Sequence, residues 1–100
     1  MQTLTSKQRA QLRGLANPIE TILQVGKGGV VPTLIKQADD ALNARELIKG
    51  RALPACEHTA REAAEMIAER TGAQVVQVIG TRFVLYRQHK NKDKRIIELV

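Results

Sequence analysis

The chain has 100 residues, 43% of them hydrophobic and 26% charged, and 16 Lys and Arg against 10 Asp and Glu give a net charge of +6. This length is typical of one domain with one small core, which leaves little room for a deep catalytic pocket. The positive charge favours a polyanionic partner, either nucleic acid or an anionic membrane surface. Basic residues gather toward the two ends of the chain, on either side of an acidic stretch over residues 54–80.

Cysteine usage and the first residues indicate the compartment. Cys56 is the only cysteine, so no internal disulfide can form and a reducing cytoplasm is expected. The N-terminus lacks the apolar stretch of a signal peptide, and no apolar run approaches the roughly 18 residues of a membrane span. We therefore expect a cytoplasmic protein with no membrane partner.

The first half of the chain predicts two helices and a strand. Residues 6–16 are expected to be helical, because Leu4, Leu12 and Leu15 recur at helical spacing, and Ser6 is available as the cap. Residues 21–25 are short, β-branched and followed by glycine, which predicts a strand. Pro32 suits the first position of a second helix that extends to about residue 44.

The second half predicts three strands and one helix. A strand is expected over residues 46–53, weakened by Gly50. Thr59 and Glu62 match a capping box that starts a third helix, and Gly72 ends it. The inner face of this helix is predicted to carry small residues and its outer face three carboxylates: Ala60, Ala63, Ala64 and Ile67 inside, Glu62, Glu65 and Glu69 outside.

Residues 75–79 and 82–87 are predicted to form a hairpin around Gly80. In the simplest register its core face carries Val76, Val78, Phe83 and Leu85, and the first helix covers the other face in part. The charged tail, residues 88–100, is expected to be a loop or frayed end in which residues 96–99 can add a short edge strand.

The alternation of helices and strands predicts the fold class. The order helix, strand, helix, strand, helix, strand, strand favours β-α-β units, and the closing hairpin makes the sheet mixed. We expect one α/β domain over residues 1–100, with an ordered core of about residues 4–87.

The run Gly26-Lys27-Gly28-Gly29 joins the first predicted strand to the second helix. Glycines let a phosphate approach the backbone without a Cβ clash, and free N–H groups at a helix start attract an anion. A P-loop needs another spacing and Ser or Thr after lysine, and a dinucleotide fingerprint needs glycine where Val31 stands. Two interpretations remain: a tight turn without ligand, and a G-x-x-G clamp on a nucleic-acid backbone.

Other patterns give weaker candidates. Cys56 and His58 have no second pair of metal ligands near them in sequence, and Cys56 has no positioned base that would make it a nucleophile. Asp39 and Asp40 are expected on a solvated helix surface.

Stacking on bases is not expected, because Phe83 and Tyr86 are the only aromatic residues. No set of residues supplies nucleophile, base and electrophile together. The sequence thus predicts a non-enzymatic protein that needs neither metal nor cofactor.

Six segments of the chain carry a family pattern. In order, they are Leu4-Thr5-Ser6-Lys7-Gln8-Arg9, Leu23-Gln24-Val25-Gly26-Lys27-Gly28-Gly29, Ile35-Lys36-Gln37, Ala44-Arg45-Glu46-Leu47-Ile48-Lys49, Val76-Gln77-Val78-Ile79-Gly80 and Val84-Leu85-Tyr86-Arg87. Together they resemble the bacterial YhbY family, the stand-alone form of the CRM (chloroplast RNA splicing and ribosome maturation) domain, over residues 4–99.

The resemblance implies a mixed four-stranded sheet with three helices, akin to the C-terminal domain of translation initiation factor three. It also implies RNA binding and association with ribosomal RNA of large-subunit precursors. By position, the family's G-x-x-G loop is Gly26 to Gly29, and its basic surroundings are Lys7, Arg9, Arg13, Lys36, Arg45 and Lys49. The chain departs from the pattern at Val31-Pro32, where a polar cap is expected, and at Gly50, in a strand that is usually more apolar.

Two hypotheses of different classes remain. The first is a monomeric RNA-binding factor that assists ribosome assembly, with ribosomal proteins as further candidate partners. The second is a protein-interaction module whose acidic third helix docks a basic ribosomal protein.

Overall fold

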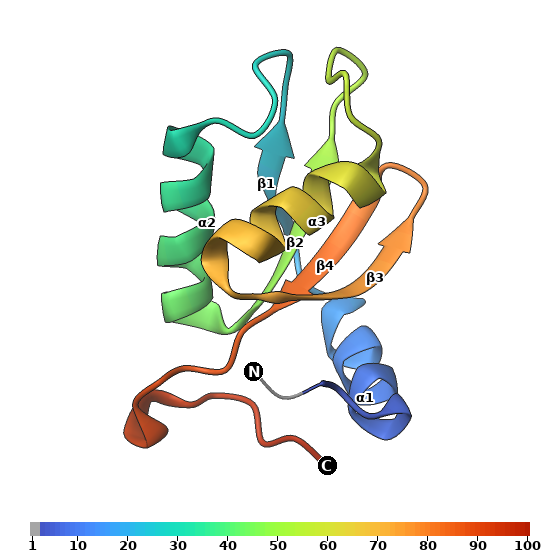
Figure 1. Cartoon of the computed structure of the whole chain (residues 1–100). Helices are drawn as coiled ribbons and strands as arrows, with labels where there is room; N and C mark the ends of the chain where they lie inside the picture. The colour runs from blue at the N-terminus through green and yellow to red at the C-terminus, as the bar shows by residue number, and fades with distance from the viewer. Residues whose placement is uncertain (1–2) are drawn as a thin grey trace.

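The computed structural model describes residues 3–100. Its elements are α1 (Ser6–Ala16), β1 (Thr21–Val25), α2 (Pro32–Arg45), β2 (Leu47–Ala52), α3 (Ala60–Thr71), β3 (Gln74–Ile79), β4 (Arg82–Tyr86) and a 3₁₀ turn (Lys92–Lys94). The four strands form one mixed sheet in the spatial order β1-β2-β4-β3, in which β1 and β2 are parallel and β4 is antiparallel to both neighbours (Figure 1). The predicted fold class and element order are confirmed.

Hydroxyl side chains set the start of two helices. Thr5 caps α1: its Oγ1 accepts the N–H of Gln8 at 3.1 Å, and the Gln8 side chain accepts the N–H of Thr5 at 3.0 Å. The predicted cap, Ser6, is instead the first helical residue. α3 begins with the predicted capping box, and its bonds from Thr59 hold the pKa of the Glu62 carboxyl below its ordinary value. α2 has no side-chain cap at its start.

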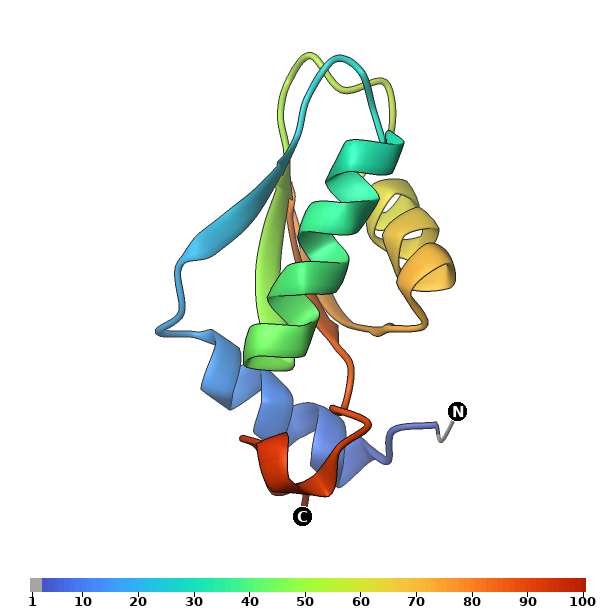
Figure 2. The same cartoon turned by 90° about the vertical axis from the view of Figure 1, so that its left-hand side faces the viewer.

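The sheet has a core on each face. The main core lies under α2 and α3 and includes Leu23, Val25, Leu34, Ala38, Leu42, Ile48, Ala63, Ala64, Ile67, Phe83 and Leu85. The second core lies under α1 and consists of Leu12, Ala16, Leu47, Val76, Val84 and Tyr86 (Figure 2). The expectation that the first helix covers part of the second face is confirmed. Leu15, however, is 43% exposed, because Leu12 and Ala16, one turn apart, occupy the positions that face the sheet.

A β-bulge in β3 overturns part of the predicted hairpin register. The pairing with β4 shifts between Val75 and Gln77, so one extra residue is inserted in β3. Val76 therefore points into the second core, while Val75 and Val78 pack against the main core. The guanidinium of Arg9 donates to the carbonyls of Val75 and Val76 at 2.7 and 3.0 Å, so two acceptors at the bulge of this edge strand are paired.

Gly50 does not weaken β2 as the sequence suggested. It is buried opposite Phe83 in the β2–β4 register, and a Cβ at this position would overlap the Phe83 ring. The glycine makes room for the largest side chain of the main core, so its packing role outweighs its low strand propensity.

Glu46 anchors the C-terminal tail. It joins α2 to β2 with a φ of 63°, its side chain is 0% exposed, and its carboxylate accepts the N–H groups of His89, Ile96 and Ile97 at 2.7, 2.7 and 2.9 Å. Burial raises the pKa of this carboxyl, but the three backbone donors together lower it more, so the pKa lies below its ordinary value.

The tail is therefore neither frayed nor an edge strand. The N–H groups of Ile96 and Ile97 bind Glu46 rather than a sheet edge. The chain then returns beside α1, where Gln11 accepts the N–H of Val100 and donates to the carbonyl of Glu98 (Figures 1 and 2). Of the two expected alternatives, a loop and a frayed end, residues 88–100 form a loop with one 3₁₀ turn, and a buried carboxylate from the middle of the chain binds it to the core.

Candidate nucleic-acid interface

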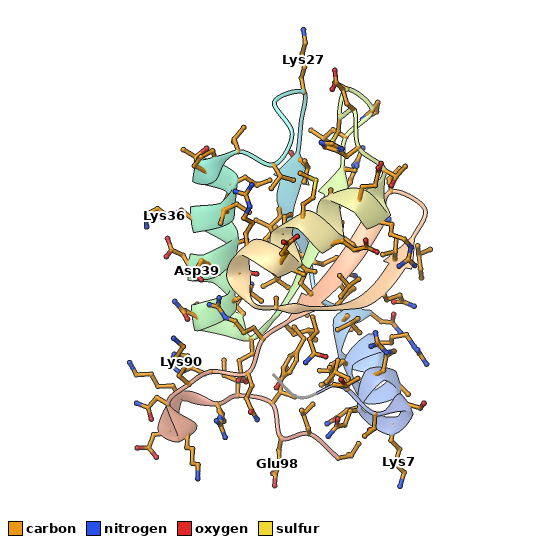
Figure 3. All side chains as sticks on the ribbon, in the orientation of Figure 1. Lys7, Lys27, Lys36, Asp39, Lys90 and Glu98 are labelled. Carbon is orange, nitrogen blue, oxygen red and sulfur yellow. The ribbon has the colours of Figure 1, made fainter. Side chains whose placement is uncertain are left out.

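The glycine-rich loop lies at one end of the molecule, where β1 passes into α2 (Figures 1 and 2). The N–H of Gly29 donates to the carbonyl of Gly26 at 3.0 Å and closes a tight turn, in which Gly29 has a φ of 72° that favours glycine. Lys27 lies at the tip of this turn and its side chain extends away from the rest of the molecule (Figure 3). The loop thus presents an exposed cation at a protruding end.

The other two glycines of the loop are not required by the fold. A Cβ at Gly26 would meet Leu53 at 3.9 Å, and one at Gly28 would meet Val31 at 3.6 Å, both ordinary contacts. Within residues 3–100, the N–H groups of Lys27 and Gly28 have no acceptor. These groups can bind an anion at a place where no Cβ blocks its approach.

A second loop, residues 53–59, lies beside the glycine-rich loop (Figures 1 and 2). The N–H of Leu53 donates to the carbonyl of Val25 at 2.9 Å, and the His58 ring stands next to Gly29, 3.6 Å from where a Cβ would be. Cys56 is half-buried and packs against the main core. Of the two candidate ligands, His58 is therefore placed to contact an occupant of the glycine-rich loop, whereas Cys56 serves packing.

Neither a metal centre nor a membrane segment is found in the part of the chain that the structure describes. Over residues 3–100, no three His, Cys, Asp or Glu side chains gather closely enough to hold a metal ion. In the same range, no helix combines the length and the apolar character that crossing a bilayer requires.

The basic residues predicted around the loop do not form a single patch. Lys7 projects from the first turn of α1, at the end of the molecule opposite Lys27 (Figure 3). Lys36 lies on the outer side of α2 and pairs with Asp40 at 3.1 Å, and Arg45 lies in the last turn of α2. The long axis of 37 Å separates these cations too far for one small ligand to contact them all.

Three other predicted cations lie on the α1 side of the sheet. Arg9 is committed to the bulge carbonyls of β3. Arg13 follows Arg9 by one turn, so it lies on the same flank of α1, and its side chain is exposed. Lys49 projects from β2 toward the end of α1, where its Nζ is 3.5 Å from the carbonyl of Asn17. Of these three cations, Lys49 lies beside the end of α1 and Arg13 is exposed on the flank of the helix.

Sequence reasoning missed two arginines on that same face. Arg51 and Arg82 are direct partners in the antiparallel register of β2 and β4, and Arg51 shares a face with Lys49 because they are two residues apart on one strand. Strand alternation could have placed Arg51 beside Lys49. Only the pairing of β2 with β4 brings Arg82 to them.

Asp39 lies on the surface of α2, as expected, with 47% of its side chain exposed, but it is paired with Arg87. Its carboxylate accepts a hydrogen bond from Arg87 at 2.6 Å, and Arg87 also donates to the carbonyl of Thr71 and to the side chain of Asn43. This arginine joins the ends of α2, α3 and β4. Asp40 is exposed, as expected.

The outer face of α3 exposes the three predicted carboxylates, on the side of the sheet away from Arg51 and Arg82 (Figure 1). Arg61 and Arg70 are also exposed on this helix, and Arg61 lies 3.7 Å from Glu65. The negative potential of this face is therefore partly neutralised.

Comparison with known proteins places the chain in a family and agrees with the fold. Residues 4–87 match the CRS1/YhbY (CRM) domain family. The chain is 45% identical to a Bacillus subtilis protein named probable RNA-binding protein YqeI, over 96% of this chain and 98% of that protein. It is 36% identical to a Haemophilus influenzae protein named RNA-binding protein, over 87% and 88% of the two chains.

A solved structure shows the same architecture. The solution structure of a Staphylococcus aureus protein superposes with a TM-score of 0.78 at 44% sequence identity, and the alignment covers 98% of this chain and 100% of that one. On the family match and the identity to these relatives, the chain belongs to the CRS1/YhbY (CRM) domain family.

Proposed function

We propose that this protein binds RNA without catalysing a reaction on it, and that the glycine-rich loop holds a phosphate of the RNA backbone. The observation that carries the proposal is the pair of glycines, Gly26 and Gly28, for which the fold itself has no steric need. Unpaired N–H groups and the exposed cation of Lys27 supply the contacts that a phosphate oxygen requires. The names of the relatives support RNA as the source of the phosphate.

The mode of recognition follows from the burial of the aromatic residues. Phe83 and Tyr86 are only 1% and 3% exposed, so neither offers a surface on which a base can stack. Contacts to phosphates and to the shape of a folded RNA remain, and the net charge of +6 favours them. The chemistry of the loop needs neither metal nor cofactor.

We further propose ribosomal RNA in precursors of the large subunit as the target, and assistance to ribosome assembly in the cytoplasm as the role. The support is the family pattern of the sequence together with the basic residues that it carries over. We expect the RNA-bound unit to be a monomer, with contacts to neighbouring ribosomal proteins.

Replacement of Lys27 by Glu tests the loop directly. The matched control is Lys92→Glu, which makes the same change in charge in the exposed 3₁₀ turn of the tail. We expect Lys27→Glu to weaken binding to large-subunit precursor RNA by about tenfold or more, because one charge-assisted contact becomes a repulsion. The slope of log K against log salt should fall by roughly 0.7–0.9 for the phosphate lost. A folded Lys27→Glu variant that binds RNA as the control does would remove the loop from the mechanism.

The protein-interaction alternative makes a different prediction. If α3 docks a basic ribosomal protein, co-sedimentation with ribosomal particles survives ribonuclease treatment, and Glu65→Lys abolishes it. If RNA is the partner, ribonuclease releases the protein and Glu65→Lys has little effect. The partial neutralisation of this face by Arg61 and Arg70 favours the second outcome.

A further inference from the structure

The sheet face opposite α2 and α3 is only half covered. α1 lies across one end of this face, and no helix covers the end next to the glycine-rich loop among the described residues (Figure 2). A hollow of about 210 Å³ lies beside the end of α1, and Lys49, Gln77 and Arg82 contribute to its lining. The outward side chains of this half of the sheet are therefore open to a partner.

The register makes Arg51 and Arg82 direct neighbours across two strands. The N–H of Ala52 donates to the carbonyl of Thr81 at 2.8 Å, which makes residues 52 and 81 a hydrogen-bonded pair of the antiparallel ladder. Their neighbours Arg51 and Arg82 consequently form a non-hydrogen-bonded pair. In such pairs the Cα atoms are about 4.5 Å apart and the side chains lie nearest to each other.

No carboxylate forms an ion pair with either arginine within residues 3–100. None of the four strands, all within residues 3–100, contains Asp or Glu. In that range neither guanidinium makes a hydrogen bond or an ion pair, and Lys49 adds a third positive charge on the same face. Like charges directly opposite each other destabilise a sheet, so the free protein carries an electrostatic cost that a bound anion would offset.

We propose that Arg51 and Arg82 form a second phosphate-binding site, which holds a phosphate of the RNA backbone next to the one held by the glycine-rich loop. Two guanidinium groups can each present paired N–H donors to the oxygens of one phosphate. The two sites are contiguous, because Arg51 is the register partner of Gln24, two residues before Gly26. This inference deepens the proposed function and rests on it.

The surroundings of the pair suit a nucleotide better than a free anion. Ile79 is the register partner of Arg82 and is 64% exposed, and Gln77 lies two residues before it on the same strand. The isoleucine offers apolar surface to a sugar or base, and the glutamine offers amide hydrogen bonds. A free phosphate would use neither.

The test compares the double variant Arg51→Gln/Arg82→Gln with the control Arg61→Gln/Arg70→Gln, which removes the same two charges from the outer face of α3. Affinity for large-subunit precursor RNA is measured over a series of salt concentrations. We expect the Arg51/Arg82 variant to lose about tenfold or more in affinity and roughly 0.7–0.9 in salt slope, and the control to lose less than about threefold. The melting temperature of the Arg51→Gln/Arg82→Gln variant should be equal to or above that of the wild type, because the like-charge pair is gone.

A second measurement separates this site from RNA binding as a whole. Tripolyphosphate is titrated into the wild-type protein while NMR follows the side-chain Nε–H signals of Arg51 and Arg82. Saturable shifts of these two signals, together with a tripolyphosphate affinity that falls in the Arg51/Arg82 variant when it is followed through the backbone amide signals of β2 and β4, support the site. They do so even if the wild-type protein fails to bind RNA and the proposed function is wrong. Absence of shifts at both arginines, or RNA binding by the variant equal to that of the control, overturns the inference.

Discussion

Replacement of Gly28 by Ala should separate folding from RNA binding. The added Cβ would meet Val31 at 3.6 Å, an ordinary contact, and Gly28 does not have the positive φ that would strain an alanine. Gly→Ala at such a position stabilises a protein by about 0.4–1 kcal/mol, because the unfolded chain loses conformational freedom. We therefore expect a melting temperature equal to or slightly above that of the wild type.

The same methyl group should weaken RNA binding. It would occupy the space through which a phosphate oxygen reaches the free N–H groups of Lys27 and Gly28. Loss of hydrogen bonds to a charged group costs about 1.5–3 kcal/mol, which corresponds to roughly 10- to 100-fold in affinity. Fluorescence anisotropy with a labelled fragment of large-subunit precursor RNA measures this loss.

Two further glycines provide controls. Gly14 lies on the exposed side of α1 with nothing within 4 Å of an added Cβ, so Gly14→Ala should stabilise the helix by up to about 1 kcal/mol without changing RNA affinity. Gly29 has a φ of 72°, so Gly29→Ala should lower stability by about 1 kcal/mol. If Gly28→Ala binds RNA as Gly14→Ala does, the lack of a side chain at Gly28 does not serve a ligand. If the Gly28→Ala variant does not fold, the steric reasoning is wrong.

Two predictions concern stability. The pKa of Glu46 is below its ordinary value of 4.5 in the folded protein, so its contribution is present at neutral pH and is lost as pH falls through the folded pKa. Glu46→Gln should lower the free energy of unfolding by roughly 2–3 kcal/mol at pH 7, and the stability of the variant should fall less steeply at acidic pH than that of the wild type. An unchanged dependence at acidic pH would contradict the role of the carboxylate. Gly50→Ala should lower the free energy of unfolding, measured with denaturant, by about 1–3 kcal/mol, because the added Cβ overlaps the Phe83 ring. The double variant Gly50→Ala/Phe83→Leu should recover part of this loss. A wild-type unfolding midpoint for Gly50→Ala would refute the packing account.

The elements that the sequence predicted well have local causes. The capping box of Thr59 and Glu62, the stop at Gly72 and the turn at Gly80 each depend on residues a few positions apart. The glycine-rich loop was found for the same reason, since its conformation is encoded in four consecutive residues. The predicted boundaries of the helices and of the four strands therefore agree with the structure to within one residue. The predicted order of these elements also agrees with it.

Features that depend on distant parts of the chain were missed. The bulge at Val76 turns one side chain to the other face of the sheet, and Arg9, from the distant α1, binds the carbonyls of Val75 and Val76 there. The burial of Glu46 depends on a tail some fifty residues later. Neither the bulge nor the burial of Glu46 leaves a periodic pattern in the sequence of a single strand or helix.

Some features of the candidate interface were likewise determined by the sequence, and others only by the tertiary structure. The amino-acid sequence determined the loop, the excess of positive charge and the family to which the chain belongs. Tertiary structure alone decided which cations gather, because strand pairing places Arg51 against Arg82 while the long axis of the fold separates Lys7 from Lys27. The conformation of the backbone depends mainly on residues that are close in sequence. The distance between two charges depends on the register of strands that pair only when the chain has folded.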